Sequence, residues 1–205
     1  MLQAIQTSYA GHLFRSRLEA RWAVFFDALK IRWEYEPEGF RQPSGRYYLP
    51  EFRLMVMTDG TYKPLWAEIK PIGGDQSTLG ELIAECEPGT RGVMLHDIPD
   101  PRRVAKGNDY YDYDGLHRWE RFREGNGWPR SGCDNYYQFC ICPSCGKAGF
   151  EFEGRSARIG CGCCDGDRSH TGDDPRIVAA FAAARSARFE HEARETFSTA
   201  GGRST

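Results

Sequence analysis

The 205-residue sequence lacks a long apolar run and has no strong excess of either charge. Its longest run of small apolar residues, 177–184, is far shorter than the roughly 20 residues that span a bilayer, and its first residues contain no apolar stretch of the signal-peptide type. We therefore expect a soluble, cytoplasmic protein with no membrane partner. The formal net charge of −2 also excludes a protein that coats DNA through overall positive charge, so any contact with DNA must be local.

Cysteines are nearly absent from the first two thirds of the sequence. Six of the eight fall between Cys140 and Cys164, and the other two, Cys86 and Cys133, are interpreted as ordinary thiols. Disulfide scaffolds belong to exported proteins, whereas clustered cysteine pairs in a chain without an export signal are typical of metal sites. The distribution therefore favours a metal site over a disulfide framework.

Apolar residues make up 40% of the sequence and aromatic residues 13%, which argues against a largely disordered chain. A chain of this length can bury one main core together with a small accessory module. In chain order we expect a core over 1–100, a connector over 101–135, a zinc ribbon over 136–168, a C-terminal helix over 172–192 and a disordered tail over 195–205.

Periodicity within the first hundred residues predicts an α/β or α+β fold, with a mixed sheet flanked by helices. A helix over 16–30 has apolar residues at helical spacing after the capping residue Ser16. The further expected elements are strands over 31–35, 47–57, 65–70 and 92–96, helices over 77–87 and 116–123, and a final helix of roughly 15 residues that begins at Pro175.

One pair of charged residues is placed side by side by strand geometry alone. Glu68 and Lys70 lie two positions apart in a predicted strand, so their side chains project from the same face while Ile69 turns toward the core. Glu51 lies on the strand expected to pair with this one across the turn at 59–60. The sequence therefore predicts two carboxylates that converge beside a lysine.

This combination suits metal-dependent hydrolysis of a phosphodiester. Mg²⁺ prefers oxygen ligands and keeps several waters, so two carboxylates and one backbone carbonyl make a suitable site. The metal would hold the phosphate and lower the pKa of a bound water, while Lys70 would orient that water or stabilise the transition state.

At these residues the sequence resembles the PD-(D/E)XK nuclease superfamily, over about residues 10–98. The resemblance rests on Pro50-Glu51, on Glu68-Ile69-Lys70 and on Glu19 in the preceding helix. The stretch over 14–22, which leads to Trp33-Glu34-Tyr35-Glu36, also resembles small phage-encoded nuclease-like proteins of this group. The resemblance implies a restriction-endonuclease-like fold, DNA as partner, and the bacterial host cytoplasm as location if the protein is phage-encoded.

Carried over residue by residue, the resemblance makes Glu51, Glu68 and the Ile69 carbonyl ligands of Mg²⁺ or Mn²⁺. It makes Lys70 the catalytic lysine and Glu19 the acid of the helix. Glu51 stands where the family usually has aspartate, and glutamate loses more rotamer freedom on ordering. The expected activity is that of a DNA endonuclease, and the alternative is a catalytically inactive nuclease fold that binds nucleic acid or protein as an accessory or counter-defence factor.

Simpler interpretations of these residues remain open. Glu19 follows Ser16 by three positions, the spacing of a capping box, and could serve only the helix N-terminus. Glu68 and Lys70 could form a surface ion pair of little energetic value. A purely structural zinc protein would leave Glu51 and Glu68 far apart, and carboxylates more than about 8 Å from each other could not share one Mg²⁺.

The strongest motif in the sequence is a double cysteine pair with the spacing of a structural zinc site. Cys142 and Cys145 form one C-x2-C, and Cys161 and Cys164 form another. Four thiolates complete a tetrahedral zinc and leave no open position, so we expect a structural Zn²⁺ in a zinc ribbon. Short ribbon strands are expected over 150–152 and 157–159.

Two neighbouring cysteines leave the register of the zinc site open. Cys140 or Cys163 could replace a neighbour as ligand, and a redox C-x-x-C is the competing interpretation. Aromatic residues over 136–139 are interpreted as packing the ribbon's small core rather than stacking on bases.

Local contacts with DNA are expected from the arginines near the start of the chain, Arg15, Arg17 and Arg21, although such clusters are commonly solvated surface. The sequence leaves the oligomeric state open, a dimer included.

Overall fold

A computed structural model describes residues 4–42, 44–58, 60–71, 91–104, 137–152, 159–163 and 174–189. Several predicted features lie outside these residues. They are the helices over 77–87 and 116–123, the greater part of the strand over 157–159, the tail over 195–205, and Cys164.

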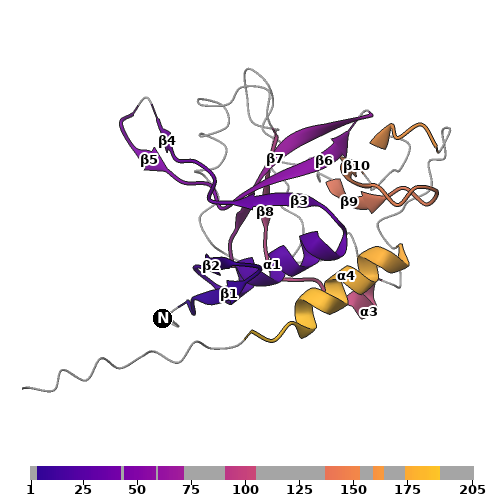
Figure 1. The fold of residues 1–205 in the computed structure, drawn as a ribbon, viewed down its shortest axis with the longest axis horizontal. Coiled ribbons are helices and arrows are strands. Elements are labelled where there is room, and N and C mark those ends of the chain that lie inside the picture. Colours follow the sequence, from indigo (N-terminus) through magenta and orange to yellow (C-terminus); the bar gives the residue numbers. More distant parts are fainter. Residues whose placement is uncertain are drawn as a thin grey trace, which may run out of the picture.

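A mixed six-stranded sheet forms the centre of the α+β fold (Figure 1). Its strands are β3 (Arg32–Tyr35), β6 (Phe52–Thr58), β7 (Thr61–Ile69), β8 (Arg91–Leu95), β9 (Tyr137–Ile141) and β10 (Ala148–Phe152). The hairpins β6–β7 and β9–β10 are antiparallel, while β7–β8 and β6–β10 run parallel. The mixed sheet and the strands over 31–35, 65–70 and 92–96 therefore follow the sequence expectation closely.

Two different strands share one edge of β6. Strand β3 pairs with its first half, from Tyr35 opposite Phe52 to Arg32 opposite Met55. Strand β10 pairs with its end, where Gly149 lies opposite Met57. A Cβ at Gly149 would lie 2.9 Å from the Met57 carbonyl oxygen, so only glycine permits this approach. Strands β9 and β10, which fall within the range expected for a zinc ribbon, are thus part of the main sheet.

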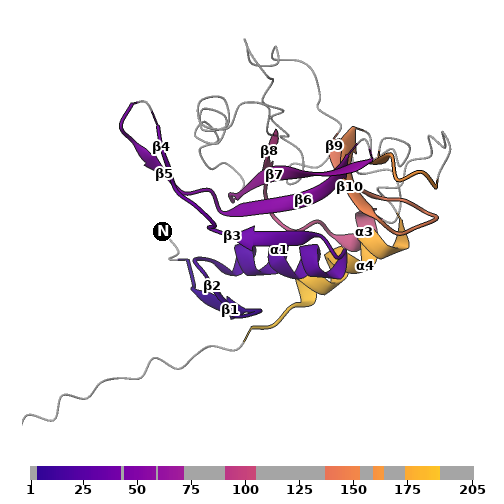
Figure 2. The same cartoon turned by 45° about the horizontal axis from the view of Figure 1, so that its top comes forward.

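Two helices cover one face of the sheet, α1 (Arg17–Ala28) and α4 (Pro175–Ser186) (Figures 1 and 2). They pack through Phe25 and Phe181, whose rings stack with centroids 4.4 Å apart. Phe139 of β9 packs edge-on against Phe25 at 5.2 Å. Phe139 therefore belongs to the main core, not to a small core of its own as the sequence suggested. A short helix, α3 (Pro101–Val104), precedes the undescribed connector.

Two small hairpins flank the sheet, and neither was predicted. One joins β1 (Thr7–Tyr9) to β2 (His12–Phe14), and the other joins β4 (Phe40–Arg41) to β5 (Tyr47–Tyr48). The strand expected over 47–57 is therefore divided, because the chain leaves β5 and bends at Glu51 before β6 begins. This bend turns out to position the candidate site.

Candidate active site and cysteine cluster

The β6–β7 hairpin brings two distant acidic residues together. Its register pairs Phe52 with Ala67, so Glu51, just before β6, comes level with the end of β7. Both Glu51 and Glu68 are buried, with 6% and 4% of their surface exposed. Burial of two carboxylates is costly unless a cation or hydrogen bonds compensate. Buried, interacting acidic groups are therefore concentrated at functional sites.

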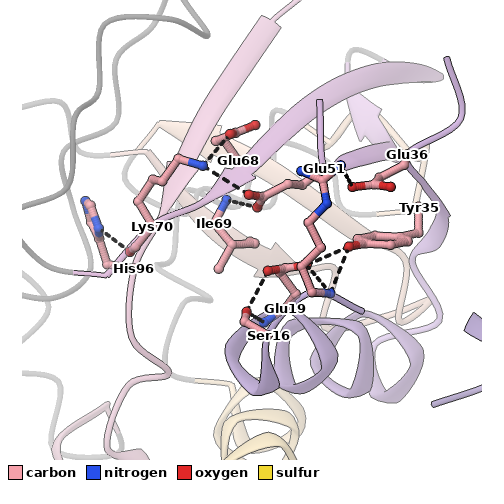
Figure 3. Close-up of polar contacts among 10 residues, drawn as sticks. Ser16, Glu19, Tyr35, Glu36, Glu51, Glu68, Ile69, Lys70 and His96 are labelled. Atoms are coloured by element: carbon pink, nitrogen blue, oxygen red, sulfur yellow. Dashed lines mark hydrogen bonds and ion pairs between the residues drawn. The ribbon is translucent and has the colours of Figure 1, made fainter. Parts of the chain in front are cut away.

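The ammonium group of Lys70 joins the two carboxylates (Figure 3). Its Nζ lies 3.0 Å from Glu51 Oε1 and 2.5 Å from Glu68 Oε1. The two oxygens are therefore no farther apart than the sum of these distances, well within the limit of about 8 Å for sharing one ion. Ile69 points the other way into the core, with 4% exposed. The predicted placement of Glu68 and Lys70 on one face of the strand agrees with this geometry.

The surroundings of Glu51 strongly perturb its ionisation. Its second oxygen, Oε2, accepts a hydrogen bond of 2.6 Å from the backbone N–H of Ile69. Burial and the negative charge of Glu68 raise the pKa of Glu51 to about 8, although Lys70 opposes this. Without a stronger cation, Glu51 therefore carries a proton near neutral pH.

Lys70 is held at both its backbone and its side chain. Its N–H donates to the Leu95 carbonyl at 2.9 Å, and its own carbonyl lies 2.8 Å from His96 Nδ1. Burial alone would lower the pKa of Lys70, but the carboxylates of Glu51 and Glu68 outweigh burial and raise it. Lys70 is thus charged at neutral pH and interacts electrostatically with both Glu51 and Glu68.

Two buried oxygen atoms in the site lack a hydrogen-bond partner among the described residues, Glu68 Oε2 and Tyr48 Oη. Burial and the negative charge of Glu68 raise the pKa of Tyr48. Neither Tyr48 nor His96 was predicted from the sequence to belong to the site. Tyr48 had no motif to mark it, because only the bend between β5 and β6 turns it toward Glu68.

Glu19 lies near Glu51 but is engaged with the start of α1 (Figure 3). Ser16 Oγ accepts from the Glu19 N–H at 3.2 Å and lies 2.6 Å from Glu19 Oε1. The other oxygen of Glu19 accepts from the Tyr35 hydroxyl at 2.7 Å and from the Arg15 N–H at 3.2 Å. The Ser16 side chain therefore caps α1 through the Glu19 N–H, as the spacing indicated, while the Glu19 carboxylate binds the Ser16 hydroxyl, the Arg15 N–H and the Tyr35 hydroxyl.

The three arginines near the start of the chain do not act as a group. Arg15 pairs with Glu36 at 2.6 Å while 58% of its side chain stays exposed. Arg17 is exposed, whereas Arg21 is half-buried against the fold. Only Arg15 and Arg17 thus present much of their surface to solvent.

Four cysteines converge at the tips of the second hairpin and the following segment: Cys142, Cys145, Cys161 and Cys163. Their sulfur atoms all lie within 4.8 Å of one another. Tetrahedral zinc with Zn–S bonds of about 2.3 Å requires sulfur atoms roughly 3.8 Å apart, so the cluster is compatible with structural Zn²⁺. Cys163, which the sequence left as an alternative ligand, lies 3.5 Å from Cys142 and 3.1 Å from Cys161 between their sulfur atoms. Cys140 is buried nearby, outside the group of four.

The cysteine cluster is fastened to the rest of the fold at two points. The Gly60 N–H, in the β6–β7 turn, donates to the Ile159 carbonyl at 2.9 Å, and a Cβ at Gly60 would approach Gly160 to the same distance. On the other side, Arg176 at the start of α4 donates to the Cys142 carbonyl at 3.3 Å. The cluster therefore connects the sheet to the last helix.

Comparison with known proteins gives no family assignment. No protein-family model matches the chain, and neither the curated proteins nor the solved structures contain a match. Among the described parts of the chain, no helix combines the length and apolar character needed to cross a membrane. The functional argument therefore rests on the site itself.

Proposed function

We propose that this protein is a metal-dependent DNA endonuclease that hydrolyses phosphodiester bonds at Glu51, Glu68 and Lys70. The observation that carries the proposal is the convergence of two buried carboxylates on one ammonium nitrogen, at 3.0 and 2.5 Å. Neighbouring buried acids are typical of catalytic and metal-binding sites. The resemblance of these residues to the PD-(D/E)XK pattern supports the same activity.

The residues fit a divalent cation by two criteria. The Lys70 ammonium contacts both carboxylates, which supports a single positive charge being shared between them. Glu68 Oε2 is buried without a partner among the described residues, so it offers an additional hard oxygen ligand. Glu51 and Glu68, with the Ile69 carbonyl that the resemblance implies, would hold Mg²⁺ or Mn²⁺.

A bound divalent ion would supply Lewis-acid activation of a water and of the phosphate. The chain's own residues would do the rest. Lys70 would donate hydrogen bonds to the attacking water or to the phosphoryl oxygens as negative charge develops. Its backbone contacts with Leu95 and His96 fix the strand end from which the side chain extends. Tyr48 would orient Glu68 from the buried side.

A second candidate function is a nuclease-like fold that binds nucleic acid or a protein partner without turnover, as a phage accessory or counter-defence factor. One observation favours it: both oxygens of Glu51 already have partners, the Ile69 N–H at 2.6 Å and Lys70 at 3.0 Å. A carboxylate that is satisfied in this way and carries a proton near neutral pH has less to offer a metal.

One assay separates the two functions. The zinc-loaded full chain would be incubated with duplex DNA, single-stranded DNA and RNA, with Mg²⁺ or Mn²⁺, beside Glu68→Gln and Lys70→Met. Glu34→Gln serves as the control, because Glu34 is an exposed acid that pairs with Arg53 on the sheet. We expect cleavage by wild type and the control only, with a loss of at least about 100-fold in the two site variants. Cleavage that survives both would disprove the mechanism, and binding without any cleavage would support the second function.

A further inference from the structure

A groove lies on the shared edge of β6, between the start of β3 and the start of β10. It has a volume of about 440 Å³. Its walls come from the end of α1, from Tyr62 of β7, from the segment after Cys145 and from the first turn of α4. These segments are far apart in the sequence, so no local motif could have indicated the groove.

Positive side chains line the groove on several sides. Lys30 follows α1, Lys147 precedes β10, and Arg176 lies on α4. No acidic side chain is among the lining residues that the structure describes. Lys30 and Lys147 are exposed and have no ion-pair partner among the described residues. Both ammonium groups are therefore available to a ligand.

Arg176 has a different role at the groove. It forms an ion pair with Asp174 at 2.7 Å and donates to the Cys142 carbonyl. The Arg176 guanidinium is thus already engaged by Asp174 and by the Cys142 carbonyl, which leaves Lys30 and Lys147 to act on a ligand.

Tyr62 at the groove and Glu68 at the candidate active site both belong to β7, with the buried Trp66 between them. Side chains two apart in a strand share a face, so Tyr62 lies on the same face as Glu68. The six positions from Tyr62 to Glu68 correspond to about 20 Å of strand. Duplex DNA rises about 3.4 Å for each base pair, so this distance corresponds to roughly six base pairs. Tyr62 is 54% exposed at the groove, where its ring can contact a sugar or base.

We propose that this groove, through Lys30, Lys147 and Tyr62, binds the phosphate backbone of a nucleic acid about six base pairs from the bond held at Glu68. The inference rests on the proposed nuclease function and identifies the surface that would bind the nucleic-acid substrate. Two phosphates contacted by the lysines would add affinity without base specificity, because lysine–phosphate contacts carry no sequence information.

The test measures binding of a fluorescent 20-base-pair duplex by anisotropy at several salt concentrations, without added Mg²⁺ so that no cleavage intervenes. The variant is the double substitution Lys30→Gln and Lys147→Gln. The control is Lys63→Gln, which removes one positive charge, against two in the double variant, from the opposite face of β7, next to Tyr62. Thermal unfolding of each variant verifies that the fold is kept.

We expect the double variant to raise Kd about tenfold at moderate salt and to reduce the slope of log K against log salt by about two, since each lost phosphate contact contributes about 0.9. The control should match wild type. Equal Kd and equal salt slope in the double variant and wild type would overturn the groove proposal. The nuclease proposal would not be affected by that result, because it is tested separately by cleavage with Mg²⁺. Conversely, weaker DNA binding by the double variant, together with no cleavage by wild type, would support the groove proposal and overturn the nuclease proposal.

Discussion

Glu51 accepts a hydrogen bond from the backbone N–H of Ile69 at 2.6 Å, although the two residues lie 18 positions apart. This bond ties the bend before β6 to the last residue of β7. It also fixes one oxygen of a buried acid, while the other faces Lys70. The Ile69 N–H therefore fixes one side of the Glu51 carboxyl group, and its ionisation depends on the cation that faces the other side.

The stability of the metal-free protein should depend on the protonation of Glu51. The folded-state pKa of Glu51 is about 8, against an ordinary value of 4.5, so between these values the folded chain binds a proton that the unfolded chain has released. The free energy of unfolding should therefore fall as pH rises through this window, by up to about 1.4 kcal/mol per pH unit. Urea unfolding at pH 5 to 8 measures the slope.

Glu51→Gln keeps the shape of the neutral carboxyl group and should remove this contribution to the slope. The exposed Glu34→Gln should retain it, because Glu34 lies on the surface of β3. Parallel pH profiles for wild type and Glu51→Gln would show that Glu51 is ionised in the folded state across this range.

Removing the ammonium of Lys70 should expose the repulsion between the two carboxylates. Lys70→Met leaves Glu51 and Glu68 buried without their counter-charge, and breaking a buried ion pair typically costs about 3–5 kcal/mol. We expect a smaller loss at pH 5, where Glu51 is neutral, than at pH 8, and a recovery when Mn²⁺ is added. Thermal unfolding at the two pH values measures both effects.

The double variant Lys70→Met with Glu51→Gln provides the control for that prediction. It removes the charge on both members of the pair, so it should be more stable at pH 8 than Lys70→Met alone. If the two variants are equally stable, the ammonium does not compensate Glu51.

Local signals in the sequence predicted the features that depend on near neighbours. Ser16 and Glu19 indicated the start of α1 because capping involves residues three apart, and Glu68 and Lys70 were placed together because side chains alternate along a strand. The pairing of Gly149 with Met57 and the approach of Tyr48 to Glu68 had no such signal. Both contacts depend on where a segment distant in the sequence packs in the fold. Sequence periodicity carries no information about that position.

Glu19 should affect stability more than chemistry. Glu19→Gln weakens bonds from Ser16, Tyr35 and the Arg15 N–H, and losing hydrogen bonds to a buried charged group costs about 1–3 kcal/mol. Ser16→Ala removes the cap from the other side and should cost about 1 kcal/mol. We expect both variants to lower the midpoint of urea unfolding while cleavage per folded molecule changes less than about tenfold. A large loss of cleavage in Glu19→Gln alone would instead make Glu19 a metal ligand.

The cysteine cluster predicts which of two adjacent cysteines binds zinc. The sulfur of Cys163 lies with those of Cys142, Cys145 and Cys161, whereas Cys164 is outside the described residues. We expect Cys163→Ser to retain much less than one equivalent of zinc per chain and Cys164→Ser to retain about one, as measured by elemental analysis. The reverse result would restore the C-x2-C register of the sequence motif.

The shared edge of β6 also has a consequence for how the protein is made. Strand β3 covers only the first half of that edge, and the remainder is paired when β10 arrives. During synthesis on the ribosome, the backbone groups near Met57 can therefore pair with β10 only after the chain has been synthesised past Gly149. An uncovered strand edge is a template for pairing with other chains, and contacts between distant residues form slowly. The interval between the emergence of β6 and of β10 is thus the period in which the nascent chain is most exposed to misassembly.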